Sequence, residues 1–139
     1  MSSAKLYNAE LLGLATSLAA YPLDENQLQR GSARSPTCGS MVEVGLSLDE
    51  RGAISRLGVK AQACAVGQAA AAIFAAQAAG KSEPDVTAAV GAIEVWLAGG
   101  PLPGWPGFSA ILAACDYPAR HGAILLPWRA ALVAFAARG

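Results

Sequence analysis

The sequence predicts an α+β fold, in which a small antiparallel sheet carries helices packed on one face. Two short segments with alternating apolar residues, 41–48 and 54–60, flank the turn signal DERG, a pattern typical of a β-hairpin. In the segments on either side, apolar residues recur every three to four positions, which is typical of amphipathic helices. One helical segment precedes the hairpin and several follow it. This order favours an α+β arrangement over alternating strands and helices.

Each element has its own local signals. The segment 6–20 is predicted to be a helix that ends at Tyr21-Pro22, because the residue before a proline disfavours helical backbone. The stretch LDENQLQRGSARSPTCGS, residues 23–40, is polar and rich in turn formers, so we expect a long loop there. Imperfect alternation near 56–58 indicates a β-bulge in the second strand.

The part of the chain after the hairpin is expected to be helical. Ser82 is the expected N-cap of one helix, with Pro84 in its first turn. The connector AGGPLPGWPG separates this helix from a short one. Pro127 either kinks the last helix or marks a start close to it. The remaining expected helices span residues 65–79, 108–115 and 123–137.

Length and composition limit the class of protein. The 139 residues suit a single domain, 1–139, and a 54% share of hydrophobic residues with only 14% charged excludes a disordered chain. Ten basic residues balance ten acidic ones without a basic patch, so neither nucleic acid nor an anionic membrane is an expected partner. Glutamines interrupt the most apolar stretch, and Glu10 interrupts the N-terminal one, so neither a membrane span nor a signal peptide is expected. We therefore expect a cytoplasmic protein.

Two cysteines flank the predicted hairpin. Cys38 precedes its first strand and Cys64 follows its second, so antiparallel pairing brings both thiols to one edge of the sheet. Cys64 also lies at a predicted helix N-terminus, where the helix dipole favours the thiolate. Two converging thiols suit a soft metal ion, a disulfide switch or sulfur transfer. The further candidates for ligands are Cys115 and His121, the only histidine.

A plainer interpretation stays open for each of these residues. Free cysteines are often buried as small apolar side chains, and a histidine at a helix entrance is often a surface or capping residue. The sequence contains no Ser-His-Asp pattern, no glycine-rich phosphate loop and no paired carboxylates at helical spacing. The sequence therefore offers none of these common catalytic or phosphate-binding patterns.

Three motifs follow one another along the chain: SPTCGSMVEV, then KAQACAVGQAAAAIFAAQAAGKS, then RHGAILLPWRAAL. In their order and spacing the chain resembles the IscU/NifU N-terminal family of iron–sulfur cluster assembly scaffolds, a fold related to that of SufE. The resemblance extends from about Tyr7 to Phe135. It implies a protein that holds iron or a nascent [2Fe–2S] cluster, or zinc in its place, and that works with a cysteine desulfurase and with cluster-acceptor proteins.

The resemblance also implies the ligands, with two departures. By position, the matching ligands are Cys38, Cys64 and His121. The aspartate that usually follows the first Cys-Gly is Ser40 here, and the third cysteine is Gly122. Ser40 and Cys115 are therefore only accessory candidates, and Cys115 reaches the site only if the segment DYPARHG folds back; otherwise it is a core residue of the preceding helix.

Three functions follow from this comparison. The first is a scaffold that holds iron or a labile cluster through thiolates and a histidine. Such a scaffold holds its product and does not turn over a substrate, so the resemblance implies a protein that is not an enzyme. The second, motivated by Gly122, is a binding or regulatory protein of the same fold that forms no cluster. The third is a SufE-like sulfur acceptor, which uses one cysteine and carries a persulfide on it.

Overall fold

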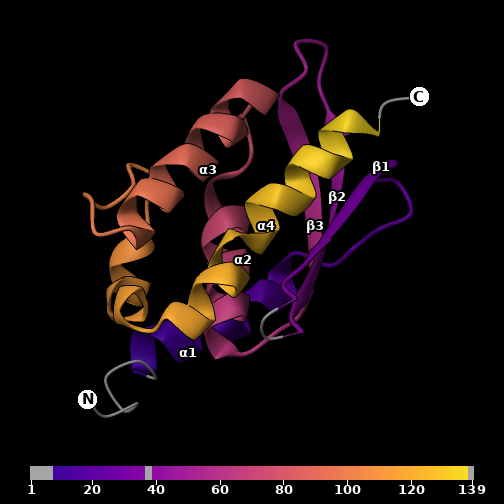
Figure 1. The fold of residues 1–139 in the computed structure, drawn as a ribbon. Coiled ribbons are helices and arrows are strands. Elements are labelled where there is room, and N and C mark those ends of the chain that lie inside the picture. The colour runs from indigo at the N-terminus through magenta and orange to yellow at the C-terminus, as the bar shows by residue number, and fades with distance from the viewer. Residues whose placement is uncertain (1–7, 37–38, 138–139) are drawn as a thin grey trace.

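A computed structural model describes residues 8–36 and 39–137. Its three antiparallel strands lie in the order β1-β2-β3, and the helices α2, α3 and α4 gather on one side of the sheet (Figure 1). The predicted α+β class, a small antiparallel sheet with helices packed on one face, is confirmed. The elements are α1 (Ala9–Ser17), the 3₁₀ turn η2 (Leu18–Ala20), β1 (Gln29–Arg34), β2 (Met41–Leu48), β3 (Ile54–Gln62), α2 (Ala65–Gln77), α3 (Glu83–Leu97), the 3₁₀ segment η3 (Phe108–Asp116) and α4 (Pro118–Ala136).

The predicted hairpin is present as β2 and β3. The register is regular from the pair Met41 and Gln62 to the pair Ser47 and Arg56, so the second strand is two residues longer than expected. The irregularity lies beyond Arg56, where Leu48 pairs with Ile54, and not within 56–58. Alternation placed the bulge too far along the strand because Arg56 and Leu57 keep their pairs although their side chains break the apolar pattern.

The predicted loop 23–40 contains a strand, so that prediction was wrong for residues 29–34. β1 pairs antiparallel with β2, from Gln29 opposite Leu46 to Arg34 opposite Met41. Its sequence, QRGSAR, has no apolar alternation to reveal it. The strand packs instead by backbone contact: a Cβ on Gly31 would lie 2.2 Å from the Ala130 carbonyl oxygen of α4. Pairing with β2 and close approach to α4 therefore define β1.

The helices begin and end near the predicted places, with one consequential exception. Ser82 caps α3 in a capping box with Asp85, as the pattern predicted for its N-terminus. The segment 108–116 is 3₁₀ and not α-helical. The last helix begins at Pro118, five residues earlier than expected, and continues through Pro127. Proline at the first helical position explains the early start, since its fixed φ suits a helix whose first N–H groups have no partner. His121 therefore lies inside the first turn of α4.

The core is built around α2 and an aromatic cluster. α2 is alanine-rich and buried over most of its length, which fits a helix enclosed between α1, α4 and β3. Trp128 of α4 is fully buried and lies 5.3–5.6 Å, centroid to centroid, from the rings of Phe74, Trp105 and Phe108. Within the described ranges, no helix has the length and apolar character needed to cross a membrane.

Candidate functional site

The turn between β1 and β2 lies beside the end of β3. The Ser35 N–H donates to the Ser40 carbonyl at 2.8 Å, and the Gly39 N–H donates to the Ser35 carbonyl at 2.9 Å. Gly39 has φ +72°, which favours glycine at this position. Since Met41 pairs with Gln62, this turn and the segment that enters α2 leave the sheet at the same end.

The first turn of α2 and the second turn of α4 also meet at this end. A Cβ on Gly67, in the first turn of α2, would lie 3.3 Å from the Cβ of Ala123 in α4. It would lie 2.7 Å from the Cβ of Ala63, so glycine allows the chain to enter α2 closely packed against α4. Cys64, the N-cap residue of α2, is thereby placed near the beginning of α4.

A third contact joins α4 to the turn. A Cβ on Gly122 would lie 2.6 Å from Ser35 Oγ and 3.4 Å from Ser35 Cβ. The three predicted motifs thus meet at one end of the sheet, where β3 gives way to α2 and α4 begins (Figure 1). We call this place the junction; its described residues are 35–36, 39–40, 62–67 and 118–123.

Cys64 lies at the N-terminus of α2. It is half-buried, and its side chain makes no capping hydrogen bond, while its carbonyl accepts from the Gln68 N–H at 2.9 Å. The 13-residue helix that begins after it directs unpaired backbone N–H groups toward this end. The predicted placement of Cys64 at a helix N-terminus is therefore confirmed.

His121 has a defined proton arrangement. Its Nε2 lies 2.9 Å from the Cys115 carbonyl oxygen, and a carbonyl only accepts hydrogen bonds. Nε2 must therefore carry the proton in this bond, which leaves the lone pair of Nδ1 available in the neutral ring. A backbone carbonyl that fixes the tautomer in this way is the usual partner of a metal-binding histidine.

Cys115 packs against the hydrophobic core. It is half-buried against the core, and its Sγ lies 3.4 Å from the Trp96 carbonyl oxygen of α3, to which it donates. Its contribution next to the junction is the backbone carbonyl that orients His121.

The structure describes two of the three predicted principal ligands, Cys64 and His121, while Cys38 lies outside the described residues. Among residues 8–36 and 39–137, no group of three or more His, Cys, Asp or Glu side chains is placed to hold a metal ion. Ser40 is 4% exposed, with its backbone carbonyl held by the turn.

Ser35 is a site candidate that sequence reasoning missed. It is 3% exposed, and its Oγ has no hydrogen-bond partner in the part of the chain that the structure describes. A buried hydroxyl without a partner costs about 1–3 kcal/mol, so such a group in a folded protein calls for an explanation. Its place three residues before Cys38 is evident in the sequence, but only the packing of α4 brings it against Gly122.

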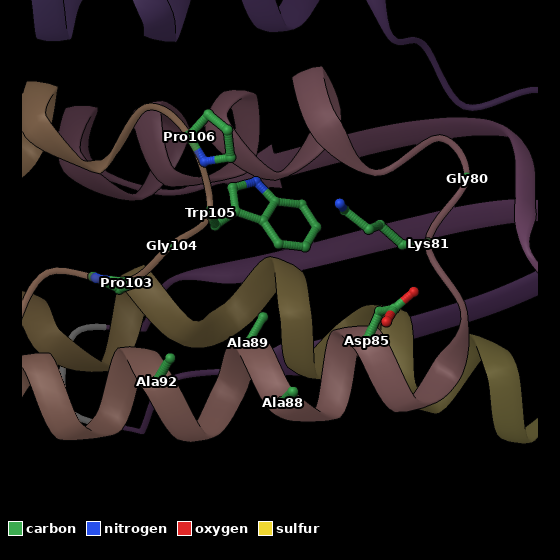
Figure 2. Close-up of a pocket in the computed structure, with 10 residues that line it drawn as sticks. All are labelled: Gly80, Lys81, Asp85, Ala88, Ala89, Ala92, Pro103, Gly104, Trp105 and Pro106. Atoms are coloured by element: carbon green, nitrogen blue, oxygen red, sulfur yellow. The ribbon is translucent and has the colours of Figure 1, made fainter.

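A separate surface cleft of about 370 Å³ lies between α3 and the connector before η3. Figure 2 shows the Lys81 side chain pointing toward the Trp105 ring; Nζ is 5.3 Å from its centroid. The walls are largely apolar, and the two charged side chains that line it are Lys81 and Asp85. Asp85 is already used by the capping box, and none of the lining residues belongs to the junction. None of the predicted ligands that the structure describes therefore lines this cleft.

Asp85 should make stability depend on acid. Hydrogen bonds from the Ser82 backbone N–H, and then from its hydroxyl, hold the pKa of the Asp85 carboxyl below its ordinary value of 3.8. A carboxyl with a lowered pKa in the folded state stabilises the protein above the unfolded value and loses this effect as the pH falls through the folded value. Asp85→Asn should therefore be less stable than the wild type at neutral pH, and the gap should narrow below about pH 4 in urea unfolding curves. In the Ser82→Ala background, Asp85→Asn should change the free energy of unfolding by a smaller amount. A difference that stays constant down to about pH 3 would contradict the assignment.

Comparison with known proteins identifies the fold. No protein-family profile and no curated protein matches the sequence. The structure is similar to a nitrogen-fixing NifU-like protein (N-terminal) from Brucella abortus, with TM-score 0.80 and 28% identity, over 91% of this chain and 90% of that one. A putative iron–sulfur cluster assembly scaffold protein for the SUF system from Fervidobacterium islandicum AW-1 has TM-score 0.77 and 18% identity, over 93% of this chain and 96% of that one. A hypothetical protein has TM-score 0.71 and 18% identity, over 94% and 99%.

The two structures at 18% identity share the fold, whereas the structure at 28% identity also carries a NifU-like description. The predicted resemblance is thereby confirmed: over 91% of its length, this chain is similar in structure to a NifU-like N-terminal protein.

Proposed function

We propose that this protein is an iron–sulfur cluster assembly scaffold, which holds iron or a labile [2Fe–2S] cluster at the junction through Cys38, Cys64 and His121. The observation that carries the proposal is the meeting of the three motif segments at one end of the sheet. The descriptions of the similar proteins from Brucella abortus and Fervidobacterium islandicum support it.

Each residue has a chemical role in this proposal. Thiolates of Cys38 and Cys64 donate charge to iron, or to zinc in its place, and Cys64 is presented at the N-terminus of α2. His121 binds through Nδ1, since its Nε2 proton is held by the Cys115 carbonyl. The ion or cluster is cargo, so the protein retains it for transfer and does not turn over a substrate.

The same proposal names the partners and the setting. A cysteine desulfurase supplies sulfur, and acceptor proteins take the finished cluster. Half-burial of Cys64 is compatible with access of such a donor to the thiol. We place the protein in the cytoplasm as a single domain, 1–139.

Anaerobic reconstitution tests the proposal. Protein purified without air is analysed for metal and then incubated with ferric iron and sulfide, whose charges sum to those of an oxidised [2Fe–2S] core. We expect visible-range absorbance from a bound cluster, and its loss in Cys38→Ala. If no absorbance appears and no metal is bound, the scaffold function is wrong for this protein.

Gly122 favours a second candidate, because the third thiol is absent from the junction. In that case the protein binds a desulfurase as a regulatory member of the fold without assembling a cluster. Co-purification of a desulfurase with metal-free protein would support it. A SufE-like acceptor would instead show a persulfide on one thiol by mass spectrometry.

A further inference from the structure

We propose that Ser35 is a ligand-binding residue of the junction, and that its hydroxyl supplies the donor that a side chain on residue 122 does not. This inference rests on the proposed function and deepens it. In this arrangement, an oxygen donor on the turn between β1 and β2 takes the place of a thiol on α4.

The first argument is steric. Ser35 Oγ lies 2.6 Å from the position of a Cβ on Gly122, well inside van der Waals contact. The hydroxyl therefore fills the space into which a side chain of residue 122 would project. Ser35 and Gly122 form a matched pair, in which the turn contributes the polar atom and the helix contributes none.

The second argument concerns the bonding of Ser35. Both of its backbone groups are paired, the N–H with the Ser40 carbonyl and the carbonyl with the Gly39 N–H. The side chain is 3% exposed and, within the described residues, its Oγ has no partner. A buried hydroxyl without a partner in a folded protein calls for an explanation, and a bound ion is one that also accounts for its place beside Gly122.

The third argument is the neighbourhood. His121 precedes Gly122 in α4, and its free Nδ1 belongs to the same turn of helix. Cys64 begins α2, which touches α4 at Ala123. The proposed donor set is then thiolate, imidazole and hydroxyl; its sulfur and nitrogen are donors that a tetrahedral divalent ion prefers, and the hydroxyl adds an oxygen.

The test uses cobalt(II), whose ligand-field and thiolate charge-transfer bands report geometry and the number of sulfur ligands. The full-length protein is titrated without air. Ser35→Ala should weaken cobalt binding by about tenfold, the smallest loss seen when such supporting groups are removed. It should leave the melting temperature of the metal-free protein unchanged or higher, because the hydroxyl it removes has no partner there. If Ser35 only filled space, Ser35→Ala would lower the melting temperature of the metal-free protein together with the cobalt affinity.

Ser35→Cys is the second variant. A thiol at this position should become an additional sulfur ligand and raise the charge-transfer intensity per bound cobalt above the wild-type value. Ser32→Cys is the matched control, because residue 32 is an exposed serine on β1, and there the intensity should stay at the wild-type value.

The outcomes separate this inference from the proposed function. If the wild type binds cobalt but Ser35→Ala binds it equally well and Ser35→Cys adds no intensity, Ser35 is not a ligand and the scaffold proposal stands. If the wild type binds no cobalt, iron or zinc, the scaffold proposal fails and the role of Ser35 fails with it.

Discussion

Gly31→Ala should lower the free energy of unfolding by about 3 kcal/mol, the upper end of the usual cost of overpacking. The added methyl would meet backbone atoms of α4, the Ala130 carbonyl oxygen at 2.2 Å and the Ala134 nitrogen at 2.3 Å. Backbone atoms in a helix cannot rotate away as a side chain can, so β1 and α4 must separate. Urea unfolding measures the effect, and a drop of the melting temperature on the order of 10 °C should accompany it.

Gly91→Ala is the control for this prediction. Gly91 lies in α3 with no atom within 4 Å of an added Cβ, so alanine should raise the free energy of unfolding by up to about 1 kcal/mol through helix propensity. Equal effects of the two substitutions would show that β1 does not approach α4 as closely as described. Because α4 carries Gly122 and His121, Gly31→Ala should also weaken metal binding at the junction.

Cys64→Ser should reduce zinc affinity at least about 100-fold, because in the proposed site it replaces a thiolate ligand by a hydroxyl. Even the loss of a group that only supports a ligand reaches that size. Competition against a zinc chelator under reducing conditions measures this. The fold should survive, since Cys64 is half-buried and its side chain makes no capping bond.

Cys115→Ser is the matched control for this loss. Its Sγ donates to the Trp96 carbonyl, and a serine hydroxyl keeps that bond while the backbone carbonyl that orients His121 is untouched. Zinc affinity should therefore remain at the wild-type value. A large loss of zinc affinity in Cys115→Ser, with no loss in Cys64→Ser, would show that Cys115 and not Cys64 is the ligand.

Part of the junction is predictable from local sequence signals. The alternation of residues 41–48 predicts the hairpin, and the hairpin places the ends of its two strands together whatever packs on them. The capping pattern at Ser82 likewise depends on neighbours three residues away. Such signals need no tertiary contact, which explains why the predictions that rest on them are correct.

The strand β1 and the start of α4 could not be predicted from the sequence, because the contacts that define them are not local. β1 carries Gly31 where an apolar side chain would normally mark a buried strand, and α4 fills that space with its own backbone. The predicted start of α4 lies too late in the chain because a proline such as Pro118 can end one helix or begin the next, and its own sequence does not distinguish the two. His121 consequently lies within the helix and not before it.

The α+β class, the hairpin, the position of Cys64 at the start of a helix and the order of the three motifs therefore follow from the sequence. They depend on periodicity, capping and strand pairing, which act over a few residues. The nitrogen of His121 that carries the proton and the side chain that stands beside Gly122 depend instead on tertiary packing. The contact between Ser35 and Gly122 joins segments that lie far apart in the chain, and close packing leaves room for Ser35 on the turn because α4 presents a glycine there.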